Sequence, residues 1–194
     1  MKHRILRSLR DVDLIQGCLQ GQEKARRMLY ERYAGRMLAL CRRYVGDRDT
    51  AEDVMIQGFM RVFERMAQYS GEGSFEGWVK RIMINEALAY LRKAKTMYLE
   101  VDIEKAEMEP DFGFLNGHME AAELLGVIDR MPAGYKAVFN LYAIEGYNHR
   151  EIAQLLGINE NTSKSQLSRA RMYLQNRLLE LERMEKAKTK DHGK

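Results

Sequence analysis

The sequence contains little proline, little cysteine and no long hydrophobic run. Its 194 residues include 2 Pro and 2 Cys against 13 Met, a composition that suits helices better than a turn-dense β sandwich. Cys18 and Cys41 are too few for a disulfide scaffold and too far apart for a CxxC motif, which indicates a reducing compartment. Apolar runs reach only five residues, far short of a membrane span. The basic segment 2–10 lacks the apolar stretch of a signal peptide, so we expect a cytoplasmic protein without membrane insertion.

Charge, by contrast, is abundant and unevenly distributed. The chain carries 32 Lys and Arg against 28 Asp and Glu, a net charge of +4. Residues 1–99 have a net charge of +7, residues 100–123 of −7 and residues 160–194 of +4. The acidic segment also holds one proline and two glycines, and it therefore predicts a flexible linker between two small domains. The boundaries that we expect are 10–95 for the first domain, 96–117 for the linker, 118–183 for the second domain and 184–194 for a basic tail.

The apolar spacing predicts an all-α fold. Apolar residues recur at threes and fours, and no stretch alternates with period two for long enough to form a strand. Asp11 and Ser74 are candidate N-caps of the helices that follow them. The expected helices cover residues 11–20, 22–45, 49–68, 75–93, 120–130 and 132–145, with two more in the motif that follows.

Residues 148–159 have the layout of a helix-turn-helix. Asn148 and Glu151 are spaced as a capping box, Gly157 can adopt the positive φ of the turn, and Asn159 can cap the last helix. The core stripe of that helix is Leu167, Ala170, Leu174, Leu178 and Leu181. At about 100° per residue, small polar and basic side chains lie on the opposite side, as a major-groove reader requires. These side chains are Asn161, Thr162, Ser165, Ser168 and Arg169, with Lys164 at the edge.

The two domains together resemble the extracytoplasmic-function (ECF) sigma factors of bacterial RNA polymerase, with features similar to those of their Bacteroidota-like branch. The resemblance runs from about residue 11 to residue 181, and it rests on the order and spacing of several motifs. In the first domain these are YVGDRDTAEDV at 44–54, GFMRVF at 58–63, GSFEGWV at 73–79, IMIN at 82–85 and YLRK at 90–93. In the second they are MP at 131–132, YAIEGY at 142–147, EIA at 151–153 and TSKSQLSRAR at 162–171.

The resemblance implies a polymerase subunit without catalysis of its own. The first domain would bind core RNA polymerase and capture the melted minus-ten promoter element, and the second would read the minus-thirty-five element. The implied polymerase contacts are Asp53, Gln57 and Arg61. The implied minus-ten contacts are Tyr69, Ser74, Trp78, Lys80, Arg81, Asn85, Arg92 and Lys93. The implied minus-thirty-five contacts are Asn161, Thr162, Lys164, Ser165, Ser168 and Arg169. Promoter DNA, core polymerase and an anti-sigma factor are the expected partners.

The chain departs from the family pattern just after Asp53. Family members usually carry Gln-Glu where this chain has Ile56 and Gln57, which leaves Asp53 as the better candidate for the polymerase contact. Simpler roles remain open for several of these residues. Trp78 lies on an apolar stripe and can be core, Asp53 can be a surface carboxylate, and Arg92 with Lys93 can be a solvated helix end.

Two other function classes remain open at this point. The first is a stand-alone helix-turn-helix regulator that binds DNA without polymerase. The second is an enzyme whose helix-turn-helix is incidental, but the sequence has no phosphate-binding glycine loop, nucleophile elbow or paired-acid arrangement. We expect no cofactor and no metal, because the four histidines His3, His118, His149 and His192 are scattered and lack ligand-like partners.

Overall fold

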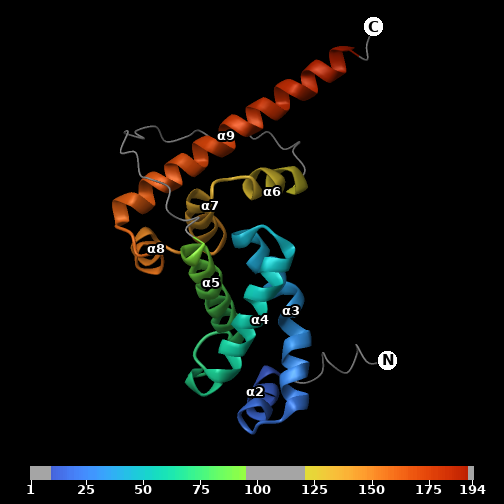
Figure 1. The fold of residues 1–194 in the computed structure, drawn as a ribbon, viewed down its shortest axis with the longest axis vertical. Helices are drawn as coiled ribbons and strands as arrows, with labels where there is room; N and C mark the ends of the chain where they lie inside the picture. Colours follow the sequence, from blue (N-terminus) through green and yellow to red (C-terminus); the bar gives the residue numbers. More distant parts are fainter. Residues whose placement is uncertain (1–9, 95–120, 192–194) are drawn as a thin grey trace. The chain divides into compact units, whose positions relative to one another are not determined.

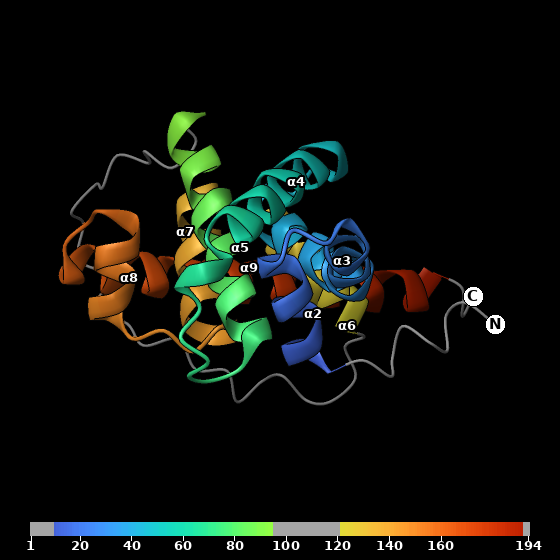
Figure 2. The ribbon, with the colours of Figure 1, turned by 90° about the horizontal axis from the view of Figure 1, so that it is seen from below.

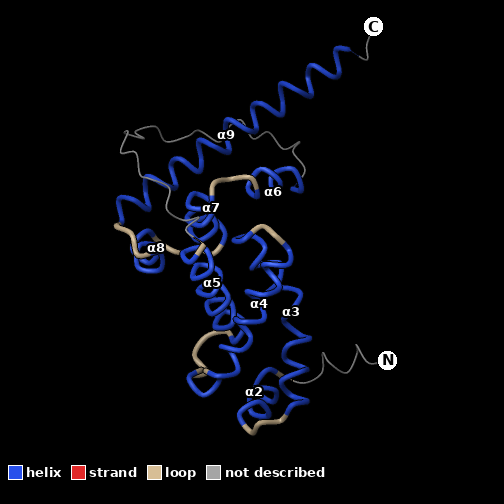
Figure 3. The backbone as a smooth tube through the Cα atoms, viewed as in Figure 1, coloured by secondary structure: helices blue, strands red, loops and turns tan. Residues whose placement is uncertain are grey.

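A computed structural model describes residues 10–94 and 121–191, and every regular element in those two ranges is helical (Figure 1 and Figure 3). The chain divides into two compact units, Met1–Ala94 and Lys95–Lys194. The prediction of an all-α chain with two helical parts is therefore confirmed. The predicted linker at 96–117 lies outside the described residues.

The first unit is built around a long central helix. Its elements are α2 (Asp11–Leu19), α3 (Glu23–Val45), α4 (Arg48–Glu64), the 3₁₀ turn η1 (Met66–Gln68) and α5 (Phe75–Lys93). Helix α3 packs against α2, α4 and α5, and α4 also packs against α5 (Figure 1 and Figure 2). The side chains that α3 buries, among them Tyr33, Met37 and Tyr44, recur at helical spacing along its length.

A glycine allows α4 and α5 to approach closely. Gly58 is buried in the middle of α4, and a Cβ atom built there would collide with the sulfur of Met83 on α5. Gly35 of α3 differs, because a Cβ atom at that position would meet no atom within 4 Å. A side chain at Gly58 would therefore displace the buried Met83, whereas one at Gly35 would displace nothing.

The two predicted N-caps of the first unit have different outcomes. Ser74 is the N-cap of α5, and its hydroxyl accepts a hydrogen bond from the Gly77 amide at 2.9 Å. Asp11 is not a cap: α2 begins at this residue, with Arg10 as N-cap. Its carboxylate instead accepts from the Tyr33 hydroxyl at 2.6 Å and from the Arg32 guanidinium at 2.7 Å. The sequence prediction failed here because both donors come from another helix.

The second unit ends in one long helix. Its elements are α6 (Ala121–Asp129), α7 (Ala133–Phe139), the π-helical turn η2 (Asn140–Ile144), α8 (His149–Leu156) and α9 (Glu160–Asp191). Helix α9 packs against α6, α7 and α8. Its core contacts with α6 use the buried Val127, Ile128, Ala170, Leu174 and Leu178.

Two sequence expectations for this unit are modified. The helix expected at 132–145 begins at Ala133, with Pro132 as its N-cap residue, and widens into the π turn η2 over its last residues. The segment 184–194, expected as a basic tail, continues α9 as far as Asp191. No helix within the described ranges is both long and apolar enough to cross a membrane.

Candidate nucleic-acid interface

The exposed face of α4 brings together the residues expected to contact polymerase. Asp53, Gln57 and Arg61 are all exposed and follow one another at intervals of four residues. The Arg61 guanidinium forms ion pairs with Glu64, at 3.0 Å, and with Glu86 of α5, at 3.6 Å. This side chain is therefore held in place before any partner binds.

The same face carries two apolar side chains that the sequence prediction did not include. Ile56 is 47% exposed and Met60 is 50% exposed, and they are four residues apart on α4. Helical spacing was the signal that could have found them, because both lie off the buried stripe of α4 that includes Val54, Phe59 and Val62. The face thus combines polar and apolar groups.

An aromatic cluster lies at the loop between η1 and α5. The Tyr69 ring is 5.2 Å from the Phe75 ring and 5.5 Å from the Trp78 ring, measured between centroids. The Tyr69 hydroxyl donates a hydrogen bond to the carbonyl oxygen of Gly73 at 3.0 Å, which closes the loop on itself. Phe75 is buried, whereas Tyr69 and Trp78 are both half-buried. Trp78 is therefore neither a core residue nor a free surface residue, and one part of each of these two rings remains accessible.

Beyond the cluster, the exposed face of α5 carries polar and basic groups. Trp78, Arg81, Asn85 and Arg92 follow at spacings of three, four and seven residues, which places them along one side of the helix. Arg81, Asn85 and Arg92 are exposed. A strip with aromatic rings at one end and guanidinium groups along its length suits a single nucleic-acid strand, because bases stack on rings and phosphates pair with cations.

Three residues predicted for the minus-ten site lie apart from this strip or have another role. Lys80 is about 160° around the helix from Trp78 and about 100° from Arg81, and its ammonium group lies 3.7 Å from the Glu76 carboxylate. Glu76 also binds Arg36 of α3 at 2.6 Å. Lys93 is exposed in the last turn of α5 but is about 100° around the helix from Arg92. Ser74 is occupied as the N-cap.

The second unit contains the predicted helix-turn-helix, and its local signals are all present. The Asn148 side chain accepts from the Glu151 amide at 3.0 Å, and the Glu151 carboxylate accepts from the Asn148 amide at 2.8 Å. Gly157 adopts the left-handed conformation with φ of 68°. Asn159 caps α9 by accepting from the Thr162 amide at 2.6 Å. These bonds and the turn define the start of α8, its end and the start of α9 from residues close in sequence.

The start of α9 presents the predicted reading face. Asn161 and Lys164 are exposed, and Thr162, Ser165, Ser168 and Arg169 are half-buried. The core stripe opposite them is buried at Leu167, Ala170, Leu174 and Leu178, which confirms the predicted orientation of the helix. Lys164 is paired with Glu160 at 2.8 Å, so part of its charge is offset in the free protein.

Behind the reading face, one polar bond joins the two helices of the motif. Ser163 is fully buried, and its hydroxyl lies 2.9 Å from Nδ1 of His149, the first residue of α8. The His149 ring stacks on Tyr142 with centroids 4.7 Å apart. Burial lowers the pKa of His149, and the nearby Lys164 and Arg171 lower it further, whereas Glu160 opposes them.

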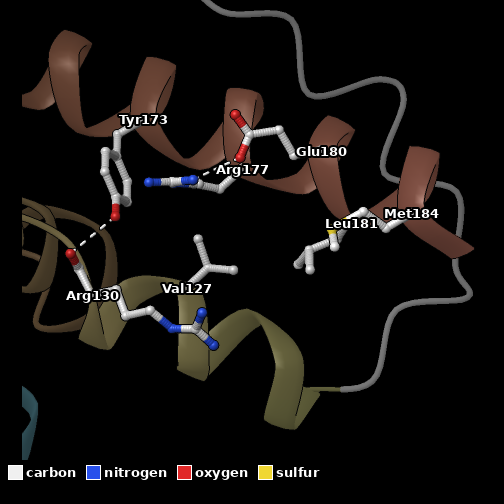
Figure 4. A pocket seen from close by; sticks show the side chains of 7 residues that line it. All are labelled: Val127, Arg130, Tyr173, Arg177, Glu180, Leu181 and Met184. Atoms are coloured by element: carbon white, nitrogen blue, oxygen red, sulfur yellow. Dashed lines mark hydrogen bonds and ion pairs between the residues drawn. The ribbon is translucent and has the colours of Figure 1, made fainter.

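A hollow of about 370 Å³ lies between α6 and α9, away from the reading face (Figure 4). Two contacts shape it: the Tyr173 hydroxyl donates to the Arg130 carbonyl oxygen at 2.9 Å, and Arg177 pairs with Glu180 at 2.7 Å. Its walls are Val127, Arg130, Tyr173, Arg177, Glu180, Leu181 and Met184. Within the described residues, no cluster of three His, Cys, Asp or Glu side chains could hold a metal ion.

Comparison with known proteins identifies both units. Residues 29–96 match the family Sigma-70 region 2, and residues 120–174 match Sigma-70, region 4. The chain is similar to the ECF RNA polymerase sigma-E factor of Haemophilus influenzae, with 27% identity over 88% of this chain and 96% of the relative. The chain belongs to the extracytoplasmic-function sigma factors. It is also similar to the ECF RNA polymerase sigma factor SigE of Mycolicibacterium smegmatis, with 30% identity over 77% of this chain and 60% of that protein.

A solved structure shares the fold of this sigma factor. It is the sigma factor RpoE of Bartonella quintana, in complex with the anti-sigma factor NepR, with a TM-score of 0.51 and 21% identity over 78% of this chain and 95% of that chain. As a sigma factor, the protein binds core RNA polymerase and directs promoter recognition and transcription initiation. Sigma factors are non-enzymatic, so the prediction of a non-enzyme is confirmed. The region 2 match also excludes the alternative of a stand-alone helix-turn-helix regulator.

Proposed function

We propose that three surfaces of this sigma factor divide its work. The exposed face of α4 around Asp53 and Gln57 binds core polymerase. The loop at 69–74 and the α5 strip hold the melted minus-ten strand, and the start of α9 reads the minus-thirty-five element. The observation that carries the proposal is that each unit matches one of the two promoter-binding sigma regions, and that most of the predicted residues lie together on the α4 face, the α5 strip or the start of α9.

The α5 strip supplies the kinds of group that strand capture needs. Taking a base out of the duplex stack costs a few kcal/mol. Stacking a base on an aromatic ring contributes about 1–3 kcal/mol, which offsets that cost, and Tyr69 with Trp78 offers such rings. Arg81, Asn85 and Arg92 then follow the strand. We assign Lys80 and Lys93 lesser roles, because they lie off this strip.

The remaining partners follow from the family. We propose an anti-sigma factor as an inhibitor of this protein; a protein of the same fold binds one in Bartonella quintana. We place the protein in the cytoplasm, where its polymerase works, and in a Bacteroidota-like branch of the family, on the motifs that carry the resemblance.

We also propose that 10–95 and 118–183 fold as separate domains, with 96–117 as a flexible linker and 184–194 as a basic extension. Limited proteolysis should then cut first between 96 and 117; first cleavage inside 130–180 would contradict this division.

Run-off transcription tests the assignment as a whole. Core polymerase from the same host is supplied with this protein and with genomic promoter fragments, and transcripts are mapped. We expect transcripts with defined start sites that depend on the protein, and permanganate reactivity of thymines around position minus ten. Transcription without promoter selectivity, or no transcription, would contradict the proposal.

Asp53→Ala tests the polymerase surface. The carboxylate is exposed, so its removal should change the free energy of unfolding by no more than about 0.5 kcal/mol. Binding to core polymerase should weaken, as measured by competition against the parent protein. Glu31→Ala is the matched control, because it removes an exposed acidic group from α3 instead. Equal affinity of parent and Asp53 variant would remove this residue from the docking surface.

A further inference from the structure

His149 occupies the junction of the two helices that form the DNA-reading motif. It is the first residue of α8, and its Nδ1 lies 2.9 Å from the hydroxyl of Ser163 in the first turn of α9. Ser163 is fully buried, so its hydroxyl needs this partner. On its other side, the imidazole stacks on the Tyr142 ring of η2, at 4.7 Å and 24° between planes. The ring therefore connects three consecutive elements at one point.

The charges around the ring belong to the reading helix. Lys164 and Arg171 of α9 face His149 with positive charge, and Glu160 of α9 faces it with negative charge. Glu160 is already paired with Lys164 at 2.8 Å. Arg171 also lies over the Tyr142 ring, 5.9 Å from its centroid. A positive charge on His149 would thus lie beside two cations and one carboxylate, and an anion supplied from outside would favour it.

We propose that His149 is a positioning residue for minus-thirty-five recognition, which holds the start of the reading helix through Ser163 and takes up a proton when promoter DNA binds. The inference rests on the proposed function of the α9 face. His149 is not among the residues predicted to contact the minus-thirty-five element. The inference adds this residue to the recognition site, and it adds proton uptake to the binding of DNA.

Proton uptake follows from the electrostatics of the site. In the free protein, burial and the two cations keep the pKa of His149 below its usual value, so the ring is neutral near pH 7. DNA phosphates next to Lys164 would neutralise the repulsion and raise the pKa of the ring. Because linkage is reciprocal, affinity for DNA must then rise as pH falls.

The hydrogen bond does not have to break when the proton arrives. A neutral Nδ1 accepts from the Ser163 hydroxyl, and a protonated Nδ1 donates to the same oxygen, which can act as either partner. The junction is therefore held in both states. What changes is the charge at the start of α8, next to the reading helix.

The test is the pH profile of holoenzyme affinity for a duplex carrying a minus-thirty-five element selected by the holoenzyme itself. For the parent we expect binding about threefold to tenfold tighter at about pH 6 than at about pH 7.5, since one proton gives at most tenfold per pH unit. His149→Gln keeps a side chain that can hydrogen-bond to Ser163 but cannot titrate. Its profile should be flatter than that of the parent by this factor.

Two further measurements separate positioning from charge. Ser163→Ala removes the hydrogen bond and keeps the imidazole, so it should weaken binding at every pH and leave the slope intact. Proton uptake on DNA binding, measured in lightly buffered solution, should be smaller for His149→Gln than for the parent. An identical slope and identical proton uptake in parent and His149→Gln would overturn the inference. Absence of selective binding by the parent would instead overturn the proposed function.

Discussion

At the scale of single residues, the start of α9 offers two cations in different settings. Arg169 is half-buried on the reading face, where a guanidinium can bind a guanine edge with two hydrogen bonds. Lys164 is exposed at the edge and paired with Glu160. We expect Arg169→Ala to cost about 1–3 kcal/mol and to relax selectivity at one base pair. Lys164→Ala should weaken all sequences alike and reduce the salt slope by about one.

Titration of both variants against selected and point-substituted minus-thirty-five duplexes, at several salt concentrations, measures the difference. Arg177→Ala serves as the control, because this arginine lines the hollow between α6 and α9 rather than the reading face. If Arg169→Ala weakened every duplex equally, the base-reading role would be wrong.

A second residue-scale prediction concerns the bond between α2 and α3. The Tyr33 hydroxyl donates to Asp11 at 2.6 Å, and both burial and this bond raise the pKa of Tyr33 well above its usual value. Tyr33→Phe keeps the ring contact with Phe75, 5.8 Å between centroids, and removes only the hydroxyl. We expect the free energy of unfolding to fall by about 1 kcal/mol, measured by urea denaturation. An unchanged denaturation midpoint would show that Arg32 alone satisfies the carboxylate.

At the scale of elements, two glycines should respond oppositely to the same substitution. Gly58→Ala forces a Cβ atom into Met83 at the contact of α4 and α5, so it should destabilise the first unit by about 1–3 kcal/mol. Gly35→Ala adds a methyl group to an exposed helical site with no atom within 4 Å, and it should stabilise that unit by about 0.5–1 kcal/mol. Thermal unfolding followed by circular dichroism distinguishes the signs. A loss of stability in both variants would contradict the packing argument for Gly58.

Elements also show what the sequence could predict. The caps at Asn148 and Asn159 and the turn at Gly157 were predictable, because each depends on residues within a few positions of itself. The partner of Asp11 was not, because it is set by the packing of α2 on α3. The position of Lys80 beside Glu76, away from the α5 strip, follows from helical phase and is therefore predictable from the sequence. The exposure of Ile56 and Met60 also follows from helical phase, because both lie off the buried stripe of α4.

At the scale of the whole molecule, the division into two compact units predicts two unfolding events. A destabilising substitution in one unit should shift only the transition of that unit. Gly58→Ala should therefore lower one midpoint in differential scanning calorimetry and leave the other unchanged. A single transition that moves as a whole would show that the units unfold together.

Helix α9 gives this molecule a mechanical property. It runs without interruption through 32 residues, about 48 Å at 1.5 Å per residue, with the reading face in its first turns. An α-helix bends sharply only where its hydrogen bonds are interrupted, so such a rod transmits a tilt from one end to the other. The helix would rotate about its contacts with α6 and α7. A force applied near Met184 would therefore move Ser165 and Arg169 together with the rest of the helix. A partner that binds several turns away from the DNA would in this way disengage promoter reading.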